Sequence, residues 1–372
     1  MKNDLSSEKF IPWAKPDFWG KEKEYVLEAL TSTWISGGLF VDRLEKGMAQ
    51  YFGSRCVLAA SNGTTALHMA FLALGLKAGD EIIVPGFGFF AAANIAALMG
   101  AKPVFCEVDP ATWCMRAVDV ERCITPKTKI IVPIHTYGNV CEMDEIMRLA
   151  DKHAIAVVED AAESFASRYD GKLSGTYGTM GSFSFQATKT ITTGEGGLVV
   201  TDRQDLCDVM ALYRSHGLMR KRHYWHELTG HNFRLTNMQA ALGCAQFEKL
   251  EDIVRERSRV HMQYKEHLGS FDGVTMQVFQ PKVDAVLWAM AVKLAPGSYP
   301  QGRDAVLHQM LTADVETRPG FYTAFDMKHL HRSERLSVCE QLSAQIISLP
   351  TFPTLTNEQI KYICKELKGF RR

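Results

Sequence analysis

The segment SFSFQATKTITTGEGGLVVTD, residues 182–202, places a single lysine, Lys189, between two strand-like apolar runs. A lysine amine becomes a nucleophile only when burial or a nearby cation lowers its pKa from about 10.4. A neutral amine can then form a Schiff base with a carbonyl compound. Taken alone, the segment equally fits an exposed turn lysine, which is the commoner case because lysine is rarely fully buried. The rest of the sequence must therefore distinguish a reactive lysine from an exposed turn lysine.

Short apolar runs alternate with longer helical patterns on both sides of this segment, which predicts an α/β layer fold. Several runs are apolar on successive residues, as in parallel strands covered on both faces. The predicted strands are residues 81–85, 103–109, 129–135, 154–160, 182–185 and 197–202, and the predicted helices are 64–76, 143–153 and 237–268.

Beyond Gly269 the pattern changes, because residues 271–279 and 287–294 alternate like antiparallel strands before a final helix. The helical pattern over 237–268 begins apolar and becomes charged, as expected for a helix that leaves one core for another. We therefore expect a large domain over residues 1–255, N-terminal segment included, and a smaller α+β domain over 256–372.

Composition indicates an ordinary cytoplasmic globular protein. Lys+Arg and Asp+Glu both number 42 in the 372 residues, so charge gives no reason to expect a nucleic acid or membrane partner. The nine cysteines show no zinc-type spacing, which predicts reduced thiols and no metal site. MKNDLSSEKF at the start has no apolar signal core, and no run of 18 apolar residues exists.

The segment SNGTTALH, residues 61–68, precedes an apolar helix and supplies hydroxyl and backbone N–H groups at its start. Such a helix N-terminus suits a phosphate group. The same residue types also favour an ordinary N-cap, so the motif alone leaves both interpretations open.

The segment VVEDAAES, residues 157–164, ends an apolar run with Glu159 and Asp160. Ligands bind at the carboxyl ends of strands in open parallel sheets, and a carboxylate buried there needs a cationic or hydrogen-bonding partner. A protonated ring nitrogen would serve, although Asp160 could instead be a helix N-cap.

These motifs together provide the anchors of a pyridoxal phosphate site: a phosphate cradle, a carboxylate for the ring nitrogen and a Schiff-base lysine. Either Phe89 or Phe90, in PGFGFF (85–90), could cover the ring, although core packing is the usual role of such residues.

The same residues resemble the nucleotide-sugar aminotransferases of the fold-type I, pyridoxal-phosphate group. The likeness rests on SNGTTALH, GDEIIVP, VVEDAAES, FSFQATKTITTGEGGLVVTD and GHNFRLTNMQAALG, and runs from about Ile11 to Gly269. Within that group TSTWIS (31–36), HTYGNVCEMD (135–144), HYWHELTGHNFRLTN (223–237) and ETRPGFY (316–322) resemble the GDP-perosamine synthases.

The resemblance implies a role for several residues. Lys189 would bind the cofactor and carry the proton to and from the substrate carbon. Asp160 would pair with the pyridinium nitrogen, Glu163 would lie near the ring hydroxyl, and Phe89 would stack on the ring. The remaining implied contacts are Gly63, Thr64 and Ser184 to the phosphate, Asn232 to the phosphate of a neighbouring subunit, and Arg318 to an anionic substrate group. His135 matches a motif histidine without an assigned role.

The activity implied is transfer of the amino group of L-glutamate to a nucleotide-linked 4-keto-6-deoxy sugar, for O-antigen or other surface glycans. The site would be shared across a homodimer. The basic stretch RSHGLMRKRHYW (214–225) could hold the diphosphate or be a solvated loop. Lysine at 189 argues against the sister branch of sugar dehydratases, which has histidine there.

The chain departs from the GDP-perosamine synthase pattern at TWISGGLF (33–40), at Gln186-Ala187-Thr188 and at GFYTAF (320–325). A 3-keto sugar, or one linked to UDP or dTDP, therefore stays an alternative. A nicotinamide oxidoreductase is disfavoured because no G-x-G-x-x-G follows the first strand. A silent binding protein is disfavoured by the intact lysine and aspartate.

Overall fold

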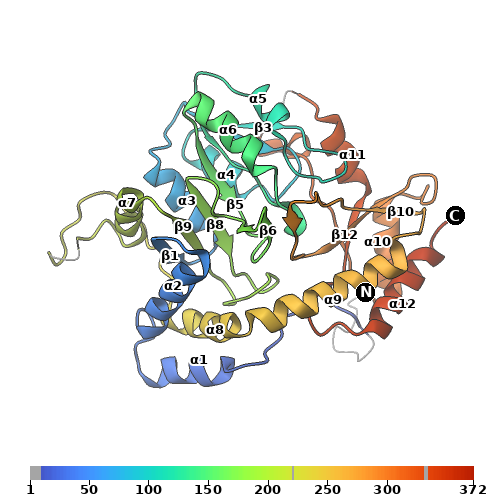
Figure 1. The fold of residues 1–372 in the computed structure, drawn as a ribbon, viewed down its shortest axis with the longest axis horizontal. Coiled ribbons are helices and arrows are strands. Elements are labelled where there is room, and N and C mark those ends of the chain that lie inside the picture. Colours follow the sequence, from blue (N-terminus) through green and yellow to red (C-terminus); the bar gives the residue numbers. More distant parts are fainter. Residues whose placement is uncertain (1–9, 220–221, 331–333) are drawn as a thin grey trace.

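A central seven-stranded sheet dominates the computed structural model, which describes residues 10–219, 222–330 and 334–372 (Figure 1). Its order is β1-β9-β8-β5-β4-β2-β3. The strands are β1 Cys56–Ala60, β2 Glu81–Pro85, β3 Lys102–Cys106, β4 Thr128–Ile131, β5 Ala156–Asp160, β8 Met180–Ser184 and β9 Gly197–Thr201. Neighbouring strands run parallel except at β9, which is antiparallel to both β1 and β8. The predicted strands are confirmed, β1 is added to them, and the sheet is mostly parallel.

Alternate residues of each strand enter different hydrophobic layers, because side chains point to opposite faces with a period of two. Leu58 of β1 packs with α3 and α4, whereas Val57 packs with α1, α2 and α8. Ile83 of β2 instead meets α6. The helices of this part are α1 Glu22–Thr31, α2 Leu39–Phe52, α3 Gly63–Ala73, α4 Ala91–Leu98, α5 Ala117–Glu121, α6 Met143–His153, α7 Gln204–Arg214 and α8 Asn237–Glu248. Burial on both faces explains the continuously apolar strand sequences.

The helical pattern over 237–268 forms two helices, because the chain breaks at Lys249 between α8 and α9 (Leu250–Leu268). The start of α9 packs against the core of the large sheet through Leu250 and Ile253. Its end packs in the C-terminal core through Tyr264, together with Ile11 from the N-terminal segment. Figure 1 shows α9 running from α8 toward the C-terminal elements, as expected of a connecting helix. The division of domains at 255/256 stays a prediction.

A four-stranded antiparallel sheet, ordered β10-β12-β14-β13, forms the C-terminal part. Its strands and helices are β10 Val274–Met276, β12 Met290–Leu294, β13 Arg318–Pro319, β14 Ile346–Leu349, α10 Arg303–Thr312, α11 Ser337–Gln345 and α12 Asn357–Gly369. A small third sheet joins β6 (Arg168–Tyr169), β7 (Lys172–Leu173) and β11 (Val283–Asp284). The short 3₁₀ helices are η1 Thr136–Gly138, η2 Ala324–Asp326 and η3 Lys328–Leu330.

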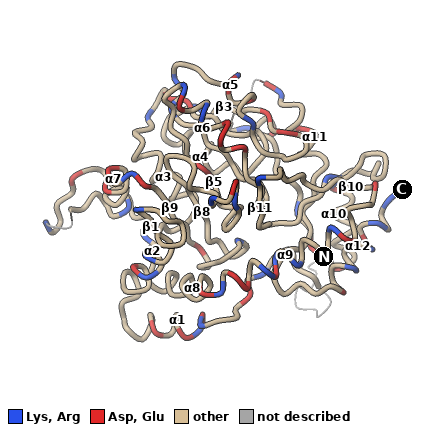
Figure 2. The backbone as a smooth tube through the Cα atoms, in the orientation of Figure 1, with Lys and Arg blue, Asp and Glu red and all other residues tan. Residues whose placement is uncertain are grey.

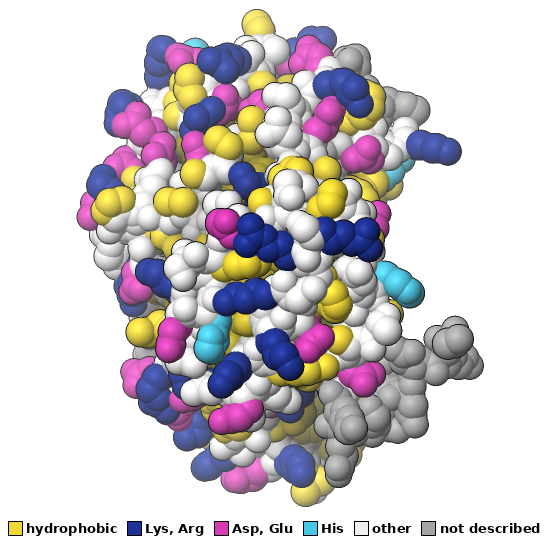
Figure 3. Space-filling model, turned by 90° about the vertical axis from the view of Figure 1, so that its right-hand side faces the viewer, with side chains coloured by type: hydrophobic (Ala, Val, Ile, Leu, Met, Phe, Trp, Pro, Cys, Tyr) yellow, Lys and Arg dark blue, Asp and Glu magenta, His cyan; other side chains and the backbone are white. Residues whose placement is uncertain are grey.

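Residues of both charge signs are interspersed along the chain (Figure 2), and their side chains are mixed on the face shown in Figure 3. Such a distribution creates no broad single-sign field for a polyanion. Within the described ranges, no helix has the length and apolar character required to cross a bilayer. The opening residues 1–9, which bear on the signal-peptide expectation, lie outside those ranges.

The expectation of reduced thiols is wrong for one pair, because Cys56 at the start of β1 forms a disulfide with Cys207 of α7. The two residues are 151 positions apart, so spacing along the chain could not reveal the pairing. Six other cysteines are buried free thiols: Cys106, Cys114, Cys141, Cys244, Cys339 and Cys364.

Candidate active site

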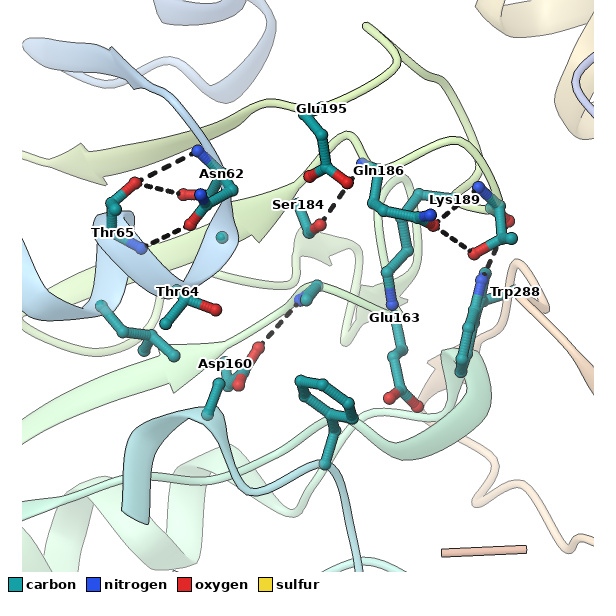
Figure 4. A pocket seen from close by; sticks show the side chains of 16 residues that line it. Asn62, Thr64, Thr65, Asp160, Glu163, Ser184, Gln186, Lys189, Glu195 and Trp288 are labelled. Carbon is teal, nitrogen blue, oxygen red and sulfur yellow. Dashed lines mark hydrogen bonds between the residues drawn. The ribbon is translucent and has the colours of Figure 1, made fainter. Parts of the chain in front are cut away.

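A cavity of about 750 Å³ opens at the carboxyl ends of the parallel strands. This is the edge at which α/β sheets bind ligands. Its described lining is Asn62, Gly63, Thr64, Thr65, Leu67, Phe89, Ala91, Asp160, Ala162, Glu163, Ser184, Gln186, Thr188, Lys189, Glu195 and Trp288. The structure thus brings most of the predicted site residues into one cavity, from segments far apart in the sequence (Figure 4).

The N-terminus of α3 forms one end of the cavity. Asn62 caps this helix, accepting a hydrogen bond from the Thr65 N–H, while Thr65 Oγ1 accepts one from the Asn62 N–H. The first N–H groups of a helix have no intrahelical acceptor, and the helix dipole favours an anion beside them. Gly63 and Thr64 provide these N–H groups, facing Ser184. The N-cap and the anion site are therefore compatible features of one motif.

The last glycine of the GEGG motif allows this end of the cavity to form. A Cβ atom added at Gly197 would lie 2.6 Å from the backbone carbonyl carbon of Asn62 and 2.7 Å from the Gly63 nitrogen. Any side chain there would push the start of α3 away from β9. The glycine next to the lysine loop therefore serves the phosphate end of the cavity.

Two buried carboxylates, Asp160 and Glu163, line the cavity. Asp160 ends β5 and accepts a hydrogen bond from the Ala162 N–H at 3.2 Å. Glu163 Oε2 accepts one from the Tyr137 N–H at 2.7 Å. Burial raises the pKa of Asp160, and burial likewise raises the pKa of Glu163 to about 7. A cationic group entering the cavity would therefore find buried negative charge in need of a partner.

Lys189 extends from the loop after β8 toward Glu163, with Trp288 beside it and Asp160 across the cavity (Figure 4). Burial lowers the pKa of its ammonium, while Glu163 and Asp160 act in the opposite direction. Its Nζ lies 3.7 Å from the centroid of the Trp288 ring. The amine is therefore directed into the cavity, and an exposed turn lysine is excluded.

The residues before Lys189 form the turn that presents it. The side-chain carbonyl of Gln186 accepts hydrogen bonds from the Thr188 N–H and hydroxyl, at 2.9 and 2.7 Å. The Gln186 backbone carbonyl accepts the N–H of Lys189. Gln186-Ala187-Thr188 is therefore a compact, self-bonded turn, and its Gln186 and Thr188 also line the cavity.

His135, to which the sequence assigned no role, is a structural residue. Its Nε2 lies 2.9 Å from Glu159 Oε2, and both side chains are fully buried. Glu159 also accepts the N–H groups of Gly175, Tyr177 and Gly178. Glu159 therefore fixes the 175–178 turn on the opposite face of β5 from the cavity residue Asp160.

Two predicted site residues lie away from the cavity lining. Asn232 is exposed and its side-chain oxygen accepts a hydrogen bond from Arg234, while its backbone pairs with Ser215. Arg318 lies on β13 and forms an ion pair with Glu316. Their assigned contacts stay predictions.

In the basic stretch 214–225, Arg214 points inward to Glu45 and the Ala59 carbonyl, so it supports β1. Arg222 lies over the ring of Trp225. Arg220 and Lys221 lie outside the described residues.

Sequence reasoning missed Trp288, Gln186, Thr188, Asn62 and Glu195 as cavity residues. Asn62 and the Gln186 turn lie within motifs already singled out, so adjacency could have identified them. Trp288 carries no such signal, because it lies in a strand-like run of the C-terminal part and reaches the lysine only through tertiary packing.

Replacement of Glu163 by glutamine should change how stability depends on pH. Its pKa in the folded state, about 7, lies above the ordinary value of 4.5. The protonated Glu163 side chain therefore contributes fully to stability below the pKa that it has in the unfolded chain. This contribution is lost as pH rises through about 7. As pH rises from about 5 to 8, the free energy of unfolding of the cofactor-free native protein should fall by about 2–3 kcal/mol more than that of Glu163→Gln. Urea unfolding at several pH values measures these free energies. The same pH dependence in both proteins would contradict the prediction.

Comparison with known proteins agrees with this site. The DegT/DnrJ/EryC1/StrS aminotransferase family model matches residues 17–368. The chain belongs to this family. A GDP-perosamine synthase from Escherichia coli O157:H7 is 39% identical, with 97% of this chain and 99% of that protein covered. One from Caulobacter vibrioides is 39% identical, with 96% and 97% covered.

Solved structures of other aminotransferases share the fold of this DegT/DnrJ/EryC1/StrS aminotransferase. An aminotransferase from Psychrobacter cryohalolentis matches with a TM-score of 0.88 and 31% identity, covering 97% of this chain and 98% of that one. Helicobacter pylori PseC, involved in pseudoaminic acid biosynthesis, matches with a TM-score of 0.93 and 25% identity, covering 97% and 99%. The protein is therefore a pyridoxal-phosphate-dependent sugar aminotransferase, which excludes the oxidoreductase alternative.

The cavity residues fit this cofactor. Its phosphate suits the N-terminus of α3, its basic ring nitrogen suits the buried Asp160, and its carbonyl suits the amine of Lys189.

Proposed function

We propose that this aminotransferase moves the amino group of L-glutamate onto C4 of a GDP-linked 4-keto-6-deoxy sugar. The observation that carries the proposal is a lysine set against two buried carboxylates in a chain that matches GDP-perosamine synthases along nearly its whole length. The product would be an amino sugar for O-antigen or another surface glycan, made in the cytoplasm.

When bound, pyridoxal phosphate supplies the carbonyl that takes up the amino group and a ring that withdraws electrons from the reacting carbon. The chain's own groups bind and orient. Gly63, Thr64 and Ser184 would hold the phosphate, and Asp160 would keep a proton on the ring nitrogen. Lys189 Nζ, directed into the cavity, would take a proton from the donor's α-carbon in the first half of the exchange and deliver one to the aminated sugar carbon in the second half.

Phe89, on the wall of the cavity, begins a series of aromatic rings that continues outside the described lining. Phe89 is 61% exposed, and its ring centroid lies 6.5 Å from that of Phe321. Phe321 in turn stacks on Tyr137 at 5.2 Å. Phe321 belongs to the GFYTAF segment that departs from the relatives' pattern, so a changed sugar preference would originate at this wall.

The described lining of the cavity contains one cation, Lys189. A nucleoside diphosphate and the cofactor phosphate together carry several negative charges, so further donors would have to come from elsewhere. A second copy of this chain, bringing Asn232 and the 214–225 stretch, would supply them. The exposed apolar side chains of Trp34, Ile35 and Leu39 are consistent with such an interface. We therefore propose a homodimer with shared sites.

At limiting cofactor, mixing an impaired variant with an inactive one should restore activity if the sites are shared. Asn232→Ala should weaken cofactor binding about tenfold, because one hydrogen bond to a charged phosphate is lost. Lys189→Ala should be inactive. After subunit exchange, about a quarter of the sites in a statistical mixture carry both native residues. Activity of the mixture above the weighted mean of the two parents supports sharing, whereas a simple average contradicts it.

A substrate screen tests the proposed reaction. L-Glutamate is supplied as donor with 4-keto and 3-keto sugars linked to GDP, UDP or dTDP, and 2-oxoglutarate formation is followed. The GDP-linked 4-keto-6-deoxy sugar should have the highest kcat/KM. A preference of about tenfold or more for a 3-keto, UDP-linked or dTDP-linked sugar would establish the corresponding alternative.

A further inference from the structure

Trp288 covers the reactive amine from the C-terminal part of the chain. It lies just before β12, and the centroid of its ring is 3.7 Å from Lys189 Nζ. Three contacts fix the ring. Its indole N–H donates to the Thr188 carbonyl at 2.9 Å, Tyr137 stacks 6.2 Å away, and Trp13 packs edge-on at 5.5 Å. Arg257 also donates to the backbone carbonyl of Trp288 at 3.1 Å. Its orientation toward the lysine is therefore set by the fold.

Arg257 ties the backbones of the two partners together. Its guanidinium donates to the carbonyls of Lys189, Leu287 and Trp288, at 3.3, 3.2 and 3.1 Å. The side chain is 4% exposed, and the described residues give it no ion pair. A buried arginine bonded only to carbonyls is costly, and here it joins α9 to both the lysine loop and the segment before β12. Arg257 therefore fixes the backbone that carries the ring and the backbone that carries the amine, which limits the distance between the two.

The ring distinguishes the two states of the amine. A cation over an indole face is attracted by the ring quadrupole, whereas a neutral amine gains little. Asp160 and Glu163 also face Lys189 and favour its charged form, while Arg257 opposes it. Burial alone disfavours the charged form of the amine. The ring face provides it with a defined resting place next to the cavity.

We propose that Trp288 is a positioning residue that holds Lys189 Nζ on its ring face as an ammonium, once this amine is free of the cofactor and has taken up a proton. In each half of the exchange the released lysine would take a proton from one carbon and would then have to deliver it to another from a defined position. The tryptophan keeps it within reach of the reacting carbon. This inference rests on the proposed role of Lys189, so its test uses cofactor-free protein, in which it can fail independently of that role.

The test compares the native chain with Trp288→Leu, which lacks a ring, and Trp288→Phe, which keeps a ring face and lacks the indole N–H. Full-length cofactor-free protein is treated with an amine-acylating reagent over a range of pH. Acylation of Lys189 is measured by peptide mass spectrometry, with the exposed Lys129 as internal reference for the reagent.

The midpoint of Lys189 acylation should fall by about one pH unit in Trp288→Leu, because the ring no longer favours the charged amine. In Trp288→Phe it should fall by less than about half of that. An unchanged midpoint in Trp288→Leu would overturn the proposal, and so would equal shifts in both variants, since these would assign the effect to the lost N–H. Thermal unfolding shows that each variant is folded. If Trp288→Leu does not fold, Trp288→Met, an unbranched chain without a ring, replaces it.

Discussion

Lys189→Ala is expected to lower the rate of amino transfer by about 10⁴-fold or more, because the variant loses both its covalent hold on the cofactor and its proton carrier. The lysine lies inside the cavity, directed toward Glu163, and the described lining holds no other amine that could replace it. The rate is followed as 2-oxoglutarate formation. Lys129→Ala, at an exposed lysine remote from the cavity, is the matched control and should retain full activity.

Borohydride provides a second measurement on the same variant. Reduction should attach the cofactor permanently to the peptide that contains Lys189 in the native chain, and to no peptide in Lys189→Ala. A variant that keeps the native rate, or cofactor attached at another lysine, would refute the assignment of Lys189.

Asp160→Asn is expected to lower kcat/KM by about 10²- to 10⁴-fold, because removing one partner of a buried charge pair costs about 3–5 kcal/mol. Asparagine has nearly the same shape and can still accept the Ala162 N–H, so the end of β5 should be preserved. The variant should also bind the cofactor more weakly, by a similar factor, which equilibrium dialysis measures.

A measurement of stability distinguishes the loss of activity and cofactor binding in Asp160→Asn from misfolding of the variant. Burial raises the pKa of Asp160, so its charge is unfavourable in the cofactor-free fold. Asp160→Asn should therefore unfold at the same or a higher urea concentration than the native protein when cofactor is absent. Asp151→Asn, at an exposed position on α6, should leave both activity and stability unchanged. An Asp160→Asn enzyme within tenfold of native activity would contradict the proposed pairing with the ring nitrogen.

The sequence predicted the cofactor end of the site because its groups lie at fixed offsets from local elements. Gly63 and Thr64 start a helix, Asp160 ends a strand, and Lys189 follows a strand, so local patterns sufficed. The antiparallel direction of β9 was not predicted, because strand direction is a property of pairing and leaves no mark on an apolar run.

Features that depend on tertiary contacts were not predicted either, because a local sequence pattern does not show which segments meet in the fold. Trp288 reaches Lys189 through the packing of α9, and Cys56 meets Cys207 only because α7 lies against β1. The break at Lys249 was also missed, since both flanking segments are helical and the pattern is continuous across it.

The adjacent acids at the end of β5 should give different phenotypes in a mutational screen of whole cells. The buried Glu159 side chain forms four hydrogen bonds that hold a turn and a histidine, so losing it should reduce the amount of protein through quality control. Asp160 has one backbone contact and faces the cavity, so losing it should leave a normally abundant but inactive protein. A screen that scores protein abundance and aminotransferase activity separately would therefore distinguish two adjacent acids, one needed for the fold and the other for the reaction.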